Sequence, residues 1–102
     1  MDVEEVSALA LALPGVKRKG TATRPGWYVD DRLVARLSDP TTLVVRMPLT
    51  EREAFLERHP TGFGVQPRME AHHKIEAYLD RVSPAALAEA LRLAWELQTG
   101  SR

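Results

Sequence analysis

The side chains with the clearest chemical potential are seven basic residues in the first half of the chain. Three follow one another and four are spread over the next segments: Lys17, Arg18, Lys19, Arg24, Arg32, Arg36 and Arg46. No acidic residue lies between Glu5 and Asp30. Gathered on one face, these cations would contact phosphates, and Trp27 or Tyr28 beside them would stack on a base. The pattern therefore indicates a nucleic-acid-binding surface.

The same side chains are also typical of an ordinary solvated surface. Arginine stems cover apolar area, and their head groups pair with nearby carboxylates. The acidic residues in reach of such pairing are Asp30, Asp31, Asp39 and Glu76. The chain has 14 basic and 14 acidic residues and a formal net charge of zero, whereas dedicated nucleic-acid binders usually carry a basic excess. Both interpretations stay open on the sequence alone.

A third interpretation is a shallow groove on an exposed sheet face. Its candidate lining residues are Trp27, Tyr28 and Tyr78, with Arg36 and Arg46 beside them. Such a groove would hold a peptide, a partner strand or a small acid. The candidate ligands are therefore DNA for the basic surface, and a protein or a small molecule for the groove.

The histidines do not form a metal-binding pattern. His72 and His73 are adjacent, so on a strand they would point to opposite faces and could not easily bind one ion. A zinc site would need further ligands such as Glu70 and His59. The sequence therefore predicts no metal site, and a polar loop is the expected role of this pair.

Signals for catalysis are equally weak. The chain has no cysteine, which excludes thiolate nucleophiles and disulfides. No serine lies in a Gly-x-Ser-x-Gly turn, and 62–64 lacks the full glycine pattern of a phosphate loop. We expect a non-enzyme without a cofactor. Acidic residues directly after Met1 argue against a signal peptide, and no apolar run approaches the roughly 20 residues of a membrane span, so we expect a cytoplasmic protein.

The element that must position these residues is a sheet centred on residues 25–47. The segment predicts three strands joined by turns at 30–32 and 38–41. Alternation places one set of side chains on a buried face: Trp27, Val29, Leu33, Ala35, Leu37, Leu43, Val45 and Met47. The open face then shows Val34, Arg36, Arg46 and Tyr28. Residues 2–13 predict a preceding helix, capped by Asp2 and ended by Pro14-Gly15, and 16–24 predict an irregular loop.

The second half predicts a helix, two strands and a final helix. Thr50 is the expected N-cap of the first of these helices, with Glu53 completing a capping box. Strands follow at 63–67 and 74–80, joined by a polar connection at 68–73. The last helix begins at Ser83-Pro84 and ends at Gly100. This order predicts an α+β two-layer sandwich, one domain over residues 1–102, with an antiparallel sheet and helices on one face.

Four stretches carry a resemblance to a known family. They are Ala8 to Val16, Trp27 to Leu37 (WYVDDRLVARL), Leu43 to Leu56 (LVVRMPLTEREAFL) and Ala77 to Trp95. Over nearly its whole length the chain resembles the YjbR/MmcQ family of small bacterial proteins. The resemblance implies an α-β(3)-α-β(2)-α fold and a DNA-binding label, which rests on similarity to a "double wing" domain. One departure is 71–74, Ala-His-His-Lys, where many relatives have a Gly-Tyr-Pro-Trp-like segment.

Overall fold

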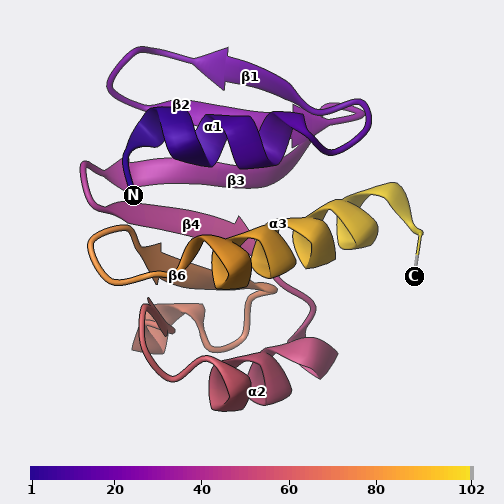
Figure 1. Cartoon of the computed structure of the whole chain (residues 1–102). Coiled ribbons are helices and arrows are strands. Elements are labelled where there is room, and N and C mark those ends of the chain that lie inside the picture. Colours follow the sequence, from indigo (N-terminus) through magenta and orange to yellow (C-terminus); the bar gives the residue numbers. More distant parts are fainter. Residues whose placement is uncertain (102) are drawn as a thin grey trace.

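The computed structural model describes residues 1–101 as a six-stranded antiparallel sheet with three α-helices on one face (Figure 1). The elements are α1 (Val3–Leu11), β1 (Lys17–Gly20), β2 (Pro25–Val29), β3 (Arg32–Asp39), β4 (Thr42–Arg46), α2 (Leu49–Arg58), β5 (Phe63–Gly64), the short 3₁₀ helix η1 (Pro67–Met69), β6 (Lys74–Tyr78) and α3 (Pro84–Thr99). The strand order is β1-β2-β3-β4-β6-β5. The predicted α+β two-layer fold is confirmed. Within the described part of the chain, no helix is both long and apolar enough to cross a membrane.

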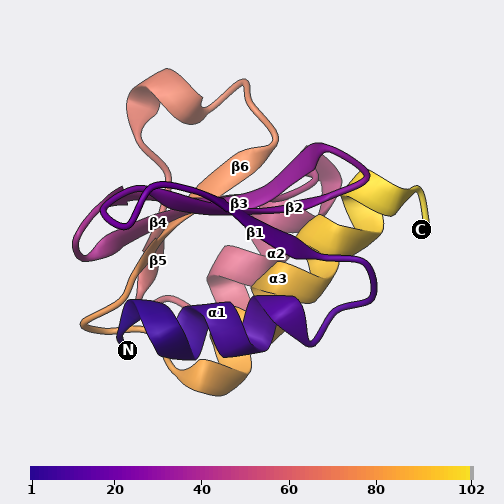
Figure 2. The same ribbon diagram turned by 90° about the horizontal axis from the view of Figure 1, so that it is seen from above.

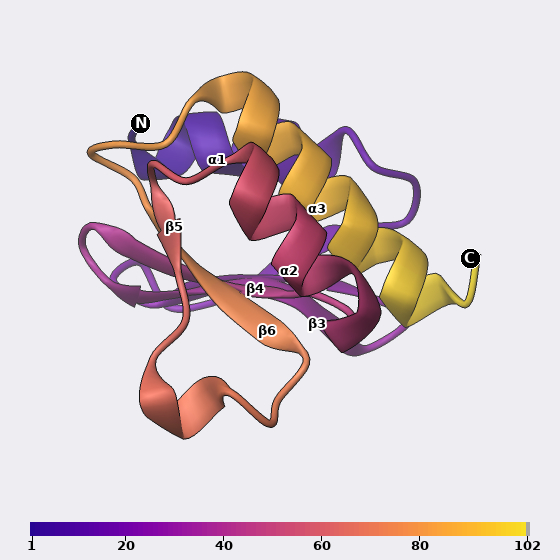
Figure 3. The same cartoon turned by 90° about the horizontal axis from the view of Figure 1, so that it is seen from below.

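The buried face of the sheet is continuous across four strands. Trp27, Ala35, Val45 and Ile75 are paired in one row, and all four are fully buried. Helix α3 covers this face with its apolar stripe, which includes Leu91, and α1 packs beside it. Figures 2 and 3 show all three helices on the same side of the sheet. Because the three α-helices bury the apolar residues of one face, the opposite face of the sheet carries no α-helix.

The predicted loop at 16–24 is wrong in part, because Lys17–Gly20 forms the edge strand β1. The segment KRKG has no alternating apolar residues, so it carries no strand signal of its own. Its hydrogen bonds to β2, with Lys17 opposite Tyr28, hold it in the sheet. Lysines on an edge strand also discourage pairing with another chain. The meander therefore has four strands, not three.

A bulge between β2 and β3 corrects the predicted alternation. Trp27 pairs with Ala35, but Tyr28 pairs with Leu33, so Val34 is the extra residue. Val34 is fully buried in the core, not on the open face. The hairpin closes through Asp30 and Asp31, whose φ angles are 51° and 61°. Two residues at positive φ are the geometry of a type I′ turn, which matches the twist of a hairpin.

Local caps behave as predicted at two helices and not at the third. Asp2 forms a capping box with Glu5, and Ser83 accepts a hydrogen bond from the Ala86 amide. The predicted cap at Thr50 is wrong: α2 begins at Leu49, preceded by Pro48 with no side-chain cap. The Leu49 amide instead donates to Nδ1 of a distant residue, His73, at 3.1 Å. The strand predicted at 63–67 is also shorter, because Pro67 begins η1.

Helices α2 and α3 are joined by an ion pair that makes stability depend on pH. Arg58 and His59 both contact Oε2 of Glu89. The hydrogen bond from Arg58 lowers the pKa of Glu89 below its ordinary value of 4.5, and His59 adds to the effect. A carboxylate with a depressed pKa stabilises the fold above its unfolded pKa, and the contribution is lost as pH falls through the folded pKa.

Glu89→Gln should therefore lower the free energy of unfolding by about 0.5 kcal/mol at neutral pH. The deficit should shrink as the pH falls below 4.5, because both proteins then lack the charge. Urea unfolding of wild type and of Glu89→Gln at a series of pH values measures this difference in the free energy of unfolding. A deficit that stays constant down to low pH would contradict the ion-pair explanation.

Candidate functional site

The candidate site is the sheet face opposite the helices, called the open face below. Paired residues of an antiparallel sheet point to the same side, so the strand registers define one row that crosses this face. This transverse row is Lys19, Gly26, Arg36, Val44, Glu76 and Gly64. Figure 2 shows the open side free of α-helices and flanked at β6 by residues 65–73, which include η1 and rise away from the sheet. Of these residues, Lys19 and Arg36 of the row have exposed side chains, whereas Val44 and Glu76 are buried.

Two tyrosines lie across the two glycines of the transverse row. A Cβ atom at Gly26 would lie 2.9 Å from Cε1 of Tyr28, and one at Gly64 would lie 2.6 Å from the hydroxyl of Tyr78. Only glycine leaves room for these rings to approach the backbone. Both tyrosines are half-buried. A glycine inside a strand was the available signal for this packing, and the sequence reasoning did not use it.

Each tyrosine ring has a cation against it. Lys19 Nζ lies 5.4 Å from the ring centroid of Tyr28, and Arg81 Cζ lies 4.9 Å from that of Tyr78. Lys19 also pairs with Asp31 at 2.8 Å, and the hydrogen bond from Lys19 lowers the pKa of Asp31. The arrangement places positive charge next to both aromatic surfaces.

Glu76 is the acidic residue of the transverse row, and it is buried. It is only 6% exposed. Its Oε1 accepts hydrogen bonds from the Tyr78 hydroxyl at 3.1 Å and from Gln66 Nε2 at 3.0 Å. Burial, followed by the hydrogen bond to Glu76, raises the pKa of Tyr78. The carboxylate therefore fixes the orientation of Tyr78.

The structure brings four of the seven predicted cations to the open face: Lys17, Lys19, Arg36 and Arg46. Lys74, which the sequence reasoning missed, joins them because it pairs with Arg46 across β4 and β6. These five residues are called the face cations below. Within residues 1–101, Arg36 and Arg46 form no ion pair. They are the cations available to a ligand at the centre of the face.

The other three predicted cations lie elsewhere. Arg18 points to the helix side, where it pairs with Glu4 at 3.2 Å. Arg32 donates to the carbonyl of Gln98 at the end of α3. Arg24 is exposed in the turn between β1 and β2. The seven residues therefore do not form one patch.

Trp27 is not a ligand-stacking residue, which corrects its proposed place in a groove. It is fully buried on the helix side of β2, and its Nε1 donates to Ser7 Oγ of α1 at 3.1 Å. Of the three predicted groove residues, only Tyr28 and Tyr78 therefore lie on the open face.

Positive and negative side chains are separated between the two layers. The strands carry seven basic residues (Lys17, Arg18, Lys19, Arg32, Arg36, Arg46 and Lys74) and two acidic ones (Asp39 and Glu76). The three α-helices carry three basic residues (Arg52, Arg58 and Arg92) and seven acidic ones (Glu4, Glu5, Glu51, Glu53, Glu57, Glu89 and Glu96). Arg18 and Arg32 reach the helical layer, so the open face keeps the five face cations, with Asp39 and Glu76 as the acidic strand residues, and this excess of positive charge favours anions there.

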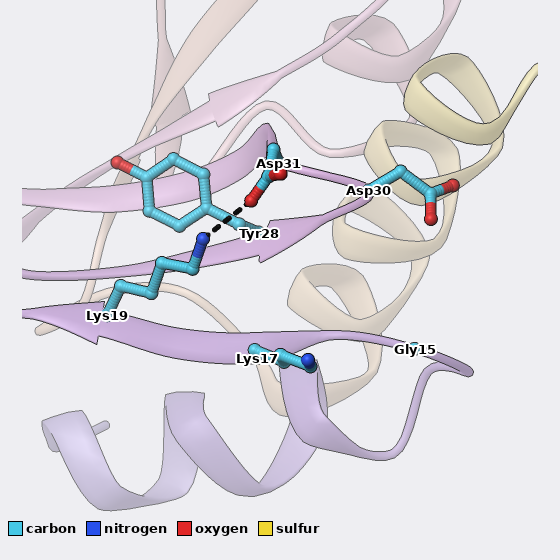
Figure 4. Close-up of a pocket in the computed structure, with 6 residues that line it drawn as sticks. All are labelled: Gly15, Lys17, Lys19, Tyr28, Asp30 and Asp31. Carbon is cyan, nitrogen blue, oxygen red and sulfur yellow. Dashed lines mark hydrogen bonds and ion pairs between the residues drawn. The ribbon is translucent and has the colours of Figure 1, made fainter.

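One end of the open face contains a small cavity of about 220 Å³. It is lined by Gly15, Lys17, Lys19, Tyr28, Asp30 and Asp31 (Figure 4). Figure 4 shows Lys19 reaching across the Tyr28 ring toward Asp31. Cations and carboxylates both line it, so the cavity suits a small ligand that carries both charges.

The segment 65–73 beside the open face is held by one arginine. Arg52 of α2 is buried, and its guanidinium donates to four backbone carbonyls, those of Met69, Glu70, His72 and Lys74. The four distances run from 2.7 to 3.3 Å. Figure 3 shows the segment as a projection beyond β6 on the side away from the helices. Arg52 therefore fixes the boundary of the face.

The two adjacent histidines belong to this same segment. His73 accepts the Leu49 amide hydrogen bond at the start of α2, so its Nδ1 has a structural role. His72 is exposed, and its carbonyl accepts from Arg52. Over the described residues, no group of three or more possible ligands could hold a metal ion.

Comparisons with known proteins identify a related fold. No protein-family model matches the sequence, and no curated protein matches it. The structure is similar to the crystal structure of Deinococcus radiodurans protein DR2400, a DUF419 domain, with a TM-score of 0.76 and 19% sequence identity. The match covers 96% of this chain and 78% of that chain. The chain therefore shares the small α+β fold of a DUF419 domain, and fold alone does not assign a function.

Proposed function

We propose that this chain is a non-enzymatic DNA-binding domain that uses the open face, a cytoplasmic member of the YjbR/MmcQ family in bacteria. The observation that carries the proposal is the separation of charge between the layers. The face cations would contact backbone phosphates, and the acidic helices would be kept away from them. The family resemblance supplies DNA as the specific nucleic acid.

The binding should depend strongly on salt. Lys19 is engaged with Asp31, so the four other face cations are the ones expected to neutralise phosphates. Counterion release then gives a slope of about −3 in a plot of log affinity against log salt concentration. A zero net charge gives no long-range attraction, so tight binding is expected only at low salt.

The test is fluorescence anisotropy of labelled DNA, duplex and single-stranded, between about 50 and 200 mM salt. Arg36→Glu and Arg46→Glu should each weaken binding about tenfold and flatten the slope. Arg92→Glu is the matched control, because it makes the same charge change on α3 of the helical layer. Undetectable binding at low salt, or an equal loss in the control, would sink the proposal.

A second candidate is a protein- or small-molecule-binding module. The cavity beside Tyr28 favours the small-molecule form, although its volume of about 220 Å³ is below the roughly 300 Å³ of ordinary ligand pockets. This candidate gains support if DNA does not bind and a small zwitterion binds beside Lys19 and Asp31.

A further inference from the structure

The two tyrosine rings of the open face lie over glycines of the same transverse row, although Tyr28 and Tyr78 themselves pair in the rows on either side of it. The Tyr28 ring covers Gly26 of β2, and the Tyr78 ring covers Gly64 of β5. Between these glycines the row passes through β3, β4 and β6. Four strand spacings of about 4.8 Å separate them by about 19 Å. A polymer that runs across the strands would meet one ring, then the central arginines, then the other ring.

We infer that the nucleic acid held by the open face is single-stranded, with bases stacked on Tyr28 and Tyr78. This inference rests on the proposed function and adds the class of nucleic acid. Bases in a duplex are stacked on one another and paired, so their faces cannot reach a flat protein surface. Unpaired bases stack on aromatic side chains without regard to sequence. The span of the row suits a segment of roughly four nucleotides or more.

The cations of the row are placed for the phosphates of such a strand. Arg36 lies in the row between the two rings, and Arg46 lies next to it on β4. Arg46 Nε is buried and has no hydrogen-bond partner among the described residues. An unsatisfied buried donor is costly, and a phosphate that draws the guanidinium outward would satisfy it. Both central arginines thus have capacity for an anion.

The cations at the two tyrosine rings also lie along the path of the nucleic-acid strand. A base that stacks on Tyr28 displaces Lys19 from the ring, and the ammonium stays paired with Asp31. Arg81 has the equivalent position at Tyr78. Glu76 is buried, and its Oε1 accepts from the Tyr78 hydroxyl and from Gln66. Its bond to the hydroxyl holds the Tyr78 side chain in place beside Gly64.

The test compares a single-stranded oligonucleotide with the duplex of the same sequence at one low salt concentration. Wild-type protein should bind the single strand at least tenfold more tightly. Tyr28→Leu and Tyr78→Leu should each weaken single-strand binding about tenfold and leave any duplex binding unchanged. Tyr28→Phe should retain tight binding, because it keeps the ring. Trp95→Leu, an aromatic change on α3, is the control that should leave affinity unchanged.

A further variant tests the same contact in case Tyr28→Leu or Tyr78→Leu does not fold. Gly64→Ala puts a methyl group where the Tyr78 ring lies, so it should reproduce the loss seen with Tyr78→Leu. Equal affinity for both DNA forms, or leucine variants that match wild type, would overturn the single-strand inference and leave the charge-based proposal intact. If neither DNA form binds, the proposed function and the inference both fail.

Discussion

Arg52→Met is expected to lower the free energy of unfolding by about 3 kcal/mol and the melting temperature by about 15 °C. The guanidinium satisfies four carbonyls of residues 69–74. Methionine has similar length but no donor, so all four carbonyls lose the guanidinium, and those of Met69 and His72 keep only the backbone amides of His72 and Lys74. Hydrogen bonds from a charged group contribute about 1.5 to 3 kcal/mol, and the loss here removes several of them at once.

Arg58→Met is the matched control, since it makes the same chemical change on the same helix. Arg58 is exposed and pairs only at the surface with Glu89, so its loss should cost less than about 1 kcal/mol. Urea denaturation of the two variants gives the comparison directly. Equal destabilisation of both variants would show that Arg52 does not organise the 65–73 segment.

The Arg52 contacts also bear on the open face. Lys74 begins β6 directly after the segment that Arg52 holds, and Gln66 within that segment orients Glu76. Loss of Arg52 should therefore loosen Tyr78 through Glu76, although Arg52 itself does not lie on the face. Arg52 therefore supports the open face without itself contacting a ligand.

Trp27→Ala is expected to cost about 4 kcal/mol. The indole is fully buried against the helical layer and donates to Ser7 Oγ, so truncation leaves a cavity and an unpaired hydroxyl. Trp27→Phe keeps most of the buried volume and should cost about 1 to 2 kcal/mol.

Thermal and urea unfolding of the two Trp27 variants measure these losses, and DNA affinity supplies the second readout. Because Trp27 faces the helices, Trp27→Phe should bind DNA as wild type does. A variant that stays stable but loses DNA binding would return Trp27 to the ligand-stacking role that the structure denies it.

The sequence predicted elements whose signals are local. Asp2 and Ser83 cap their helices as their types indicate, and Asp30-Asp31 forms the expected turn. Elements fixed by distant partners were missed. β1 exists because β2 supplies its hydrogen bonds, and α2 begins at Leu49 because His73, 24 residues away, accepts its amide. Such contacts leave no periodic trace in the segment that they stabilise.

The candidate site was predictable only in outline for the same reason. Alternation correctly placed Arg36 and Arg46 on the face away from the core. It could not reveal that Lys74 would join them, or that Tyr28 and Tyr78 would reach one row, because strand order and register are set by the whole sheet. The bulge at Val34 likewise reversed a side chain that strict alternation had placed outside.

The most direct test of the central claim is an NMR titration of the protein with a single-stranded oligonucleotide at low salt. The amide shifts of the strands around Tyr28, Arg36, Arg46 and Tyr78 should change together and revert when salt is added. The amides on the exposed sides of α1 and α3 should not move. Shift changes confined to the helical layer, or none at any protein-to-DNA ratio, would contradict a DNA-binding open face.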